Sequence, residues 1–160
     1  MSFYDWLLFA HVAAAFAMVS ALVTFWVVAI AARNVERPAD SVRYFRITKQ
    51  ANLLVAVGAF GTLLLGIWLA IDADAYQVWD GWVIGAIVLW AITVWAGQRG
   101  GVNYAEAQKL AERLTAEGRG DEPNAELRAR LKDQNAAILN AVSSLAVLLI
   151  LVDMIYKPGA

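Results

Sequence analysis

The sequence predicts an all-α fold, a four-helix transmembrane bundle with helical extensions on its cytoplasmic side. Two observations lead to this prediction. Hydrophobic residues make up 61% of the 160 residues, whereas soluble domains are about 45–50% apolar. The apolar residues are also concentrated in four long blocks. Each block is long enough to cross the roughly 30 Å hydrocarbon core of a bilayer as a helix.

The first apolar block predicts a retained transmembrane helix. Its N-terminal flank carries an acidic residue, Asp5, and no basic residue, and no small-residue cleavage site closes the block. A cleaved signal peptide has a basic N-terminal flank and a small-residue cleavage site, so we expect this helix to stay in the protein. We expect a single integral membrane domain over residues 1–160. Its spans are expected at about residues 6–31, 51–71, 78–96 and 136–156.

The basic residues are gathered in the two long connections, residues 32–50 and 97–135. These connections contain 12 of the 13 Lys and Arg residues. The positive-inside rule places both connections in the cytoplasm and both termini outside. In the first connection, Asp40 or Ser41 is expected to cap a helix that runs into the second span.

The second long connection, residues 97–135, is expected to form a helical hairpin. A helix is predicted over residues 104–117, and the stretch GRGDEP interrupts it. A further helix begins near Asn124 and places Leu127 and Leu131 one turn apart on one face. We expect this hairpin to extend the bundle into solvent. A helix lying on the lipid surface is less favoured, because the apolar face is narrow.

Small residues recur at intervals of about four along the predicted spans. Such spacing permits close approach of helices in lipid. We expect these residues to pack the bundle internally, because the single short GxxxG motif in the third span is weak evidence for a dimer. Homodimerisation through these residues is the open alternative. The expected packing residues are Ala13, Ala17, Ala21, Gly58, Thr62, Gly66, Gly81 and Gly85.

His11 is the one histidine of the chain, and it lies inside the first span. It is about five residues, or roughly 8 Å, from the outer end of that span. Asp153 lies about three residues inside the outer end of the fourth span, at a similar depth. Polar side chains in lipid need partners, so we expect a hydrogen-bonded pair of His11 and Asp153. The alternatives are a histidine that reaches water, a ligand site or a proton site.

Few residues in the sequence suit a cofactor. The absence of cysteine excludes disulfides, cysteine-ligated zinc and iron–sulfur clusters. We expect no cofactor, with haem or copper as the alternative. His11 would then be the ligand, with Met18, seven residues later on the same helical face, or Met154 as a second one. The few methionines of an apolar chain are more simply core residues.

Three short stretches carry a resemblance to a known family. LLFAHVAAAF, GTLLLGIWLA and DMIYKPG resemble motifs of a bacterial family of integral membrane proteins of unknown function. The resemblance covers nearly the whole chain. It implies a four-span protein of the bacterial plasma membrane. That family is similar in turn to the transmembrane domain of copper resistance protein D, which implies a copper- or haem-linked role.

The sequence favours a non-enzymatic role, as a structural or accessory membrane module. It contains no catalytic triad of suitable spacing, no glycine-rich phosphate loop and no carboxylate dyad in the spans. Two alternatives remain, a metal- or haem-linked protein that uses His11 and a proton-coupled carrier that uses His11 and Asp153. The net charge of −1 suggests no nucleic-acid partner. The expected partners are the lipid bilayer and either a homo-oligomer or a larger membrane complex.

Overall fold

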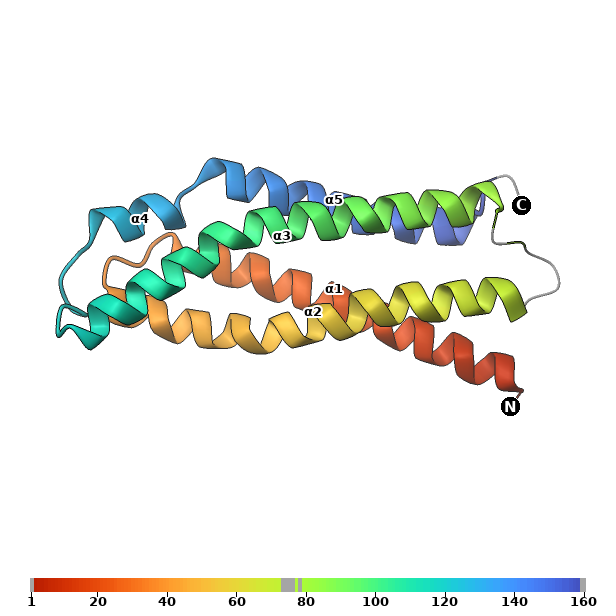
Figure 1. The fold of residues 1–160 in the computed structure, drawn as a ribbon, viewed down its shortest axis with the longest axis horizontal. Helices are drawn as coiled ribbons and strands as arrows, with labels where there is room; N and C mark the ends of the chain where they lie inside the picture. The colour runs from red at the N-terminus through yellow and green to blue at the C-terminus, as the bar shows by residue number, and fades with distance from the viewer. Residues whose placement is uncertain (1, 73–76, 78, 159–160) are drawn as a thin grey trace.

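The computed structural model describes residues 2–72, 77 and 79–158, and it folds this part of the chain into helices without strands. Four helices are long and apolar enough to cross a membrane, which confirms the expected four-span, all-α fold (Figure 1). The fourth of them is the stretch Ala125–Tyr156, which contains a short helix followed by a long one. In chain order the helices are α1 (Phe3–Ala32), α2 (Pro38–Asp72), α3 (Gly81–Ala116), α4 (Ala125–Leu131) and α5 (Gln134–Tyr156).

Local polar residues fix the ends of the helices. At the start of α1, the Ser2 hydroxyl accepts a hydrogen bond from the Asp5 amide, and the Asp5 carboxylate accepts one from the Ser2 amide. This reciprocal capping box satisfies two amides that the helix leaves unpaired. Asp133 caps α5 by accepting from the Ala136 amide at 3.0 Å. α2 begins at Pro38, before the two expected capping residues, because proline suits the first helical position.

α3 is one continuous helix from Gly81 to Ala116. The sequence predicts a third span followed by a separate helix over residues 104–117, and this boundary does not exist in the structure. The three glycines between them stay helical, and Gly100 is buried against α5. A Cβ at Gly100 would lie 2.8 Å from Oδ1 of Asn140. Close packing against α5 therefore supports helical backbone where propensity alone disfavours it.

The long helices pack as two antiparallel pairs, α1 with α2 and α3 with α5, and α2 also contacts α3. Both termini lie at one end of the molecule, which we call the termini end. α4 and the turn between α1 and α2 lie at the opposite end (Figure 1). We call this the basic end, because the two connections there carry 12 of the 13 basic residues.

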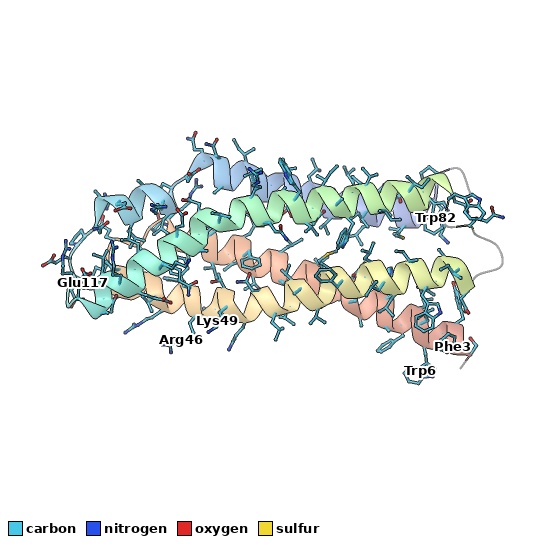
Figure 2. All side chains as sticks on the ribbon, viewed as in Figure 1. Phe3, Trp6, Arg46, Lys49, Trp82 and Glu117 are labelled. Atoms are coloured by element: carbon cyan, nitrogen blue, oxygen red, sulfur yellow. The ribbon has the colours of Figure 1, made fainter. Side chains whose placement is uncertain are left out.

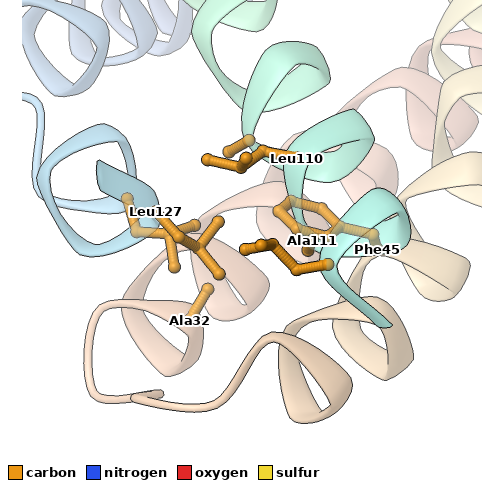
Figure 3. Packing of buried hydrophobic residues seen from close by; sticks show 8 residues of the cluster. Ala32, Phe45, Leu110, Ala111 and Leu127 are labelled. Carbon is orange, nitrogen blue, oxygen red and sulfur yellow. The ribbon is translucent and has the colours of Figure 1, made fainter. Parts of the chain in front are cut away.

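Beyond the apolar spans, the basic end has its own hydrophobic core (Figure 3). α4 contributes Leu127 and Leu131, which are 2% and 1% exposed and form the expected apolar face. An ion pair between Arg128 and Glu36 joins α4 to the α1–α2 turn, and Arg130 pairs with Glu106 on α3. The core cluster consists of Ala32, Phe45, Ala107, Leu110, Ala111, Leu114, Leu127 and Leu131.

Near the middle of the bundle, two indoles tie the helix pairs together. Nε1 of Trp26 on α1 donates to Oγ of Ser144 on α5 at 2.8 Å. Nε1 of Trp90 on α3 donates to the carbonyl of Ala59 on α2 at 2.9 Å. Both bonds cross between the two pairs, so they fix the distance between them where lipid provides no competing water.

Replacing Trp90 with Phe should lower the free energy of unfolding by about 1 kcal/mol. The phenyl ring keeps most of the apolar contact but removes the donor to the Ala59 carbonyl, and interhelical hydrogen bonds in membranes contribute about 0.6–1.7 kcal/mol. Detergent-induced unfolding of the purified protein measures the change. Trp68→Phe is the control, because the Trp68 side chain is 51% exposed. Equal losses in the two variants would show that the indole bond contributes nothing.

Candidate functional site

A small cavity lies between the two helix pairs, in the half of the bundle nearer the termini. Its volume is about 40 Å³. A single water needs a volume of at least roughly 10–15 Å³, so the cavity has room for one to three waters. We call it the termini-half cavity. Residues from all four long helices line it, including Met18, Thr62, Gly66, Trp82, Ile150 and Met154.

His11 packs against one wall of this cavity. The imidazole lies on Gly66 of α2, so closely that a Cβ at Gly66 would be 2.9 Å from the His11 Cε1 atom. Glycine at this position therefore makes room for the ring. The imidazole also interacts with the backbone of Thr62, one turn before Gly66. Its Nδ1 atom is buried and has no hydrogen-bond partner in the described part of the chain.

Thr62 adds a second buried polar atom to the same wall. The side chain is 8% exposed and lines the cavity, and its hydroxyl has no hydrogen-bond partner among the described residues. The other intramembrane threonines differ in this respect. Thr24 and Thr93 donate to the carbonyls of Ser20 and Leu89 in their own helices. The sequence predicts Thr62 as a packing residue, and the structure adds that its buried hydroxyl is unpaired among the described residues.

Asp153 lies in the other helix pair. Its Oδ1 atom would be 3.5 Å from a Cβ built at Gly85 of α3. Its Oδ2 atom is buried without a hydrogen-bond partner within the described residues. The next residue, Met154, lines the termini-half cavity. Asp153 is therefore close to the cavity, on the side of α5 and α3.

The structure does not form the expected hydrogen bond between His11 and Asp153 in the part of the chain that it describes. The physical reason is the pairing of the helices. His11 lies in the seam between α1 and α2, whereas Asp153 lies in the seam between α5 and α3. Similar depth in the membrane follows from the sequence, but a shared seam does not.

Trp82, near the start of α3, is 6% exposed and lies in the wall of the cavity. The Lys157 ammonium lies 5.4 Å from the centroid of the indole ring, within the range of a cation–π contact. A pattern in the sequence identifies this wall. Trp82, Ala86 and Trp90 follow one another at intervals of four, on one face of α3. All three line the cavity.

The glycines expected as packing residues differ in how closely a neighbouring helix approaches them. Gly58 and Gly66 are both in close contact with atoms of α1, and Gly85 packs against the Asp153 carboxylate. A Cβ at Gly81 would have the Pro158 carbonyl 3.8 Å away, an ordinary contact distance.

In α1, Ala21 is buried and Ala17 half-buried, but Ala13 is exposed. Ala14 and Met18 instead form the closest contact with α2, through their backbone atoms at Gly58. The contact face of α1 is therefore rotated by about one residue from the expected one at this end of the helix.

No group of three or more His, Asp or Glu side chains in the described ranges is placed to hold a metal ion. The two candidate thioether ligands, Met18 and Met154, line the same cavity from opposite helix pairs. His11 approaches the cavity from the α1–α2 side, through Gly66. The structure therefore brings two thioethers to one internal space, and the His11 imidazole lies next to Gly66 in the wall of that space.

Four membrane-spanning helices around a small, mainly apolar cavity define a multi-span α-helical integral membrane protein. A family model described as "predicted integral membrane protein (DUF2269)" matches residues 5–158, nearly the entire chain. The chain belongs to this family. Comparisons with curated proteins and with solved structures found no match.

Proposed function

We propose that this protein is a non-enzymatic accessory module of the bacterial plasma membrane that holds a small polar guest, water or a proton, in its termini-half cavity. The observation that carries the proposal is a pair of unpaired polar atoms, one on Thr62 in the cavity wall and one on His11, which packs on Gly66 of the same wall. The His11 Nδ1 atom and the Thr62 hydroxyl are buried and unpaired among the described residues. Buried polar groups without partners are costly in lipid, so a guest that hydrogen-bonds to them stabilises the bundle.

The size of the cavity supports a small guest. Sites for organic ligands and cofactors usually occupy about 300–1,000 Å³, whereas this cavity measures about 40 Å³. Haem would require the two helix pairs to separate. A proton-coupled carrier would have to move protons between His11 and Asp153 across separate seams, and for this reason we favour a static guest site.

The orientation is part of the proposal. We infer that the basic end faces the cytoplasm and that both termini lie outside, because 12 of the 13 basic residues lie in the two connections of the basic end. The bilayer is the proposed partner of the exposed apolar side chains. A homo-oligomer or a larger membrane complex is a further proposal, which crosslinking in native membranes tests.

Because His11 is the one histidine, ¹⁵N-histidine labelling gives a single reporter of the guest. In bilayer samples, solid-state NMR should show magnetisation transfer from water to the His11 imidazole. Thr62→Val should weaken this transfer several-fold, because it removes the neighbouring hydroxyl while keeping the shape of the side chain. Thr24→Val is the matched control, since the Thr24 hydroxyl already donates to the Ser20 carbonyl at 2.8 Å. Absence of magnetisation transfer from water to His11 in the unmodified protein would overturn the proposal.

A soft metal ion is the second candidate guest, because Met18 and Met154 line the same cavity. Thioethers and an imidazole together suit Cu(I). This candidate predicts one copper per chain after Cu(I) loading of the detergent-purified protein. His11→Ala and Met18→Leu should each abolish stoichiometric copper, whereas Thr24→Val should retain it. Elemental analysis that finds no copper above the His11→Ala level would exclude this candidate.

A further inference from the structure

We propose that the start of α2 binds the phosphate of an anionic phospholipid headgroup. The site is a row of three basic side chains, Arg43, Arg46 and Lys49, which we call the α2 basic row. All three are exposed. Successive members are three residues apart, so they lie on neighbouring positions of one side of the helix. Figure 2 shows Arg46 and Lys49 extending from α2 away from the bundle.

The α2 basic row lies at the depth of the headgroup layer. The apolar part of α2, residues 51–71, has a length of about 30 Å and matches the hydrocarbon core. Lys49 lies just outside this part, and Arg43 lies about 9 Å further from it than Lys49 does. The headgroup layer on each side of a bilayer is about 5–8 Å thick. Lys49 and Arg46 therefore lie in the layer that contains the lipid phosphates, and Arg43 lies just beyond it.

The described residues provide no ion-pair partner for the α2 basic row. In the part of the chain that the structure describes, the ion pairs involve Arg113, Arg119, Arg128 and Arg130. None of them includes a member of the α2 basic row. Asp40 precedes Arg43 by three residues on the same helix, and no ion pair joins them within the described residues. The positive charge of the row is therefore available to an external anion.

The same side of α2 continues into the membrane as an apolar surface. Leu53, Val57 and Leu64 follow Arg46 at helical spacing and are 68%, 59% and 63% exposed. An acyl chain can lie along these side chains while its phosphate contacts the cations. Such a surface fits a diacyl phospholipid better than a soluble anion.

An open groove of about 400 Å³ adjoins the row at the turn between α1 and α2. Its polar lining consists of two cations, Arg37 and Arg43, the side chains of Tyr44 and Asn34, and two carboxylates, Asp40 and Glu36, of which Glu36 pairs with Arg128. This mixture of cationic, hydroxyl, amide and carboxylate groups suits a headgroup that carries hydroxyls beyond its phosphate. We therefore choose phosphatidylglycerol as the probe.

Native mass spectrometry of the full chain tests the proposal. The protein is released from nanodiscs that contain equal amounts of phosphatidylglycerol and phosphatidylcholine, and the retained lipids are counted. The unmodified protein should retain phosphatidylglycerol preferentially. The triple variant R43Q/R46Q/K49Q should lose this preference by about tenfold, since each interfacial cation contributes about 1 kcal/mol, or about fivefold, before screening.

The matched control is K109Q/R113Q/R119Q, which removes the same three positive charges from exposed positions of the basic end. These positions lie more than about 15 Å beyond the end of the third apolar span, so the lipid preference should be unchanged. Equal losses in both variants would overturn the proposal, because they would indicate a general charge effect. Displacement of the retained lipid by inorganic phosphate at equal concentration would also overturn it, since the site would then recognise a free anion.

Discussion

Gly58→Ala is expected to lower the free energy of unfolding by about 3 kcal/mol, at the upper end of the range for overpacking. A Cβ at Gly58 would lie 2.6 Å from the amide nitrogen of Met18 and 2.9 Å from the carbonyl oxygen of Ala14. Both atoms belong to the backbone of α1 and cannot turn aside as a flexible side chain can. The two helices must move apart, and the contact between them is lost over several turns. Detergent-induced unfolding of the purified protein measures the loss.

Gly101→Ala is the matched control for this substitution. Gly101 also lies within a helix, and a Cβ there would meet no atom within 4 Å. The same chemical change should therefore stabilise the protein slightly, by up to about 1 kcal/mol, through helix propensity. Opposite signs for the two variants would identify steric contact as the cause. A Gly58→Ala variant as stable as the unmodified protein would contradict the close approach of α1 and α2.

Leu127→Ala should have the second large effect, a loss of about 3 kcal/mol from the core at the basic end. Truncation of a buried leucine removes apolar contact and leaves a cavity, at a typical cost of about 2–5 kcal/mol. Leu127 is 2% exposed and joins α4 to residues of α1, α2 and α3. α4 is a single short helix of 7 residues with one other buried leucine. We therefore expect it to detach before the membrane-spanning helices separate.

Limited proteolysis and hydrogen exchange report this detachment. Cleavage within residues 117–133 should become faster in Leu127→Ala, while exchange in the spans stays slow. Val102→Ala is the control, because Val102 lies on α3 with 56% of its surface exposed. Faster exchange throughout all helices would contradict a separate core at the basic end.

The spans follow from the sequence because length and apolar composition alone decide them in a membrane. The continuity of α3 does not, since three nearby glycines weaken helix propensity, and it is packing against α5 at Gly97 and Gly100 that compensates. Sequence spacing also cannot select between adjacent faces of α1. Ala13 and Ala14 differ by about 100° around the helix, and both belong to runs of small residues. The structure chooses Ala14, because its backbone meets Gly58.

The sequence points to individual residues of the candidate site, but it does not predict how they are arranged. His11 stands out because it is the one histidine in an apolar span, and Asp153 because of its depth. Their separation depends on which helices pair, and that choice depends on contacts between residues far apart in the chain. Thr62 could not be distinguished from other small residues, because an unpaired hydroxyl is a property of its surroundings.

The interhelical hydrogen bonds of α3 divide this helix into a short segment and a long segment. Its hydrogen bonds through Trp90 and Thr93, to α2 and α5, hold it at a point about 14 Å from its start at the termini end. The long segment, from Trp90 to Ala116, is about 39 Å long and reaches the core at the basic end. A rigid tilt about that point would displace the far tip almost three times as much as the start of α3 at the termini end. Such a tilt is opposed where Gly100 packs against Asn140 of α5 and where Glu106 pairs with Arg130, so the cavity wall and the basic end can move only together.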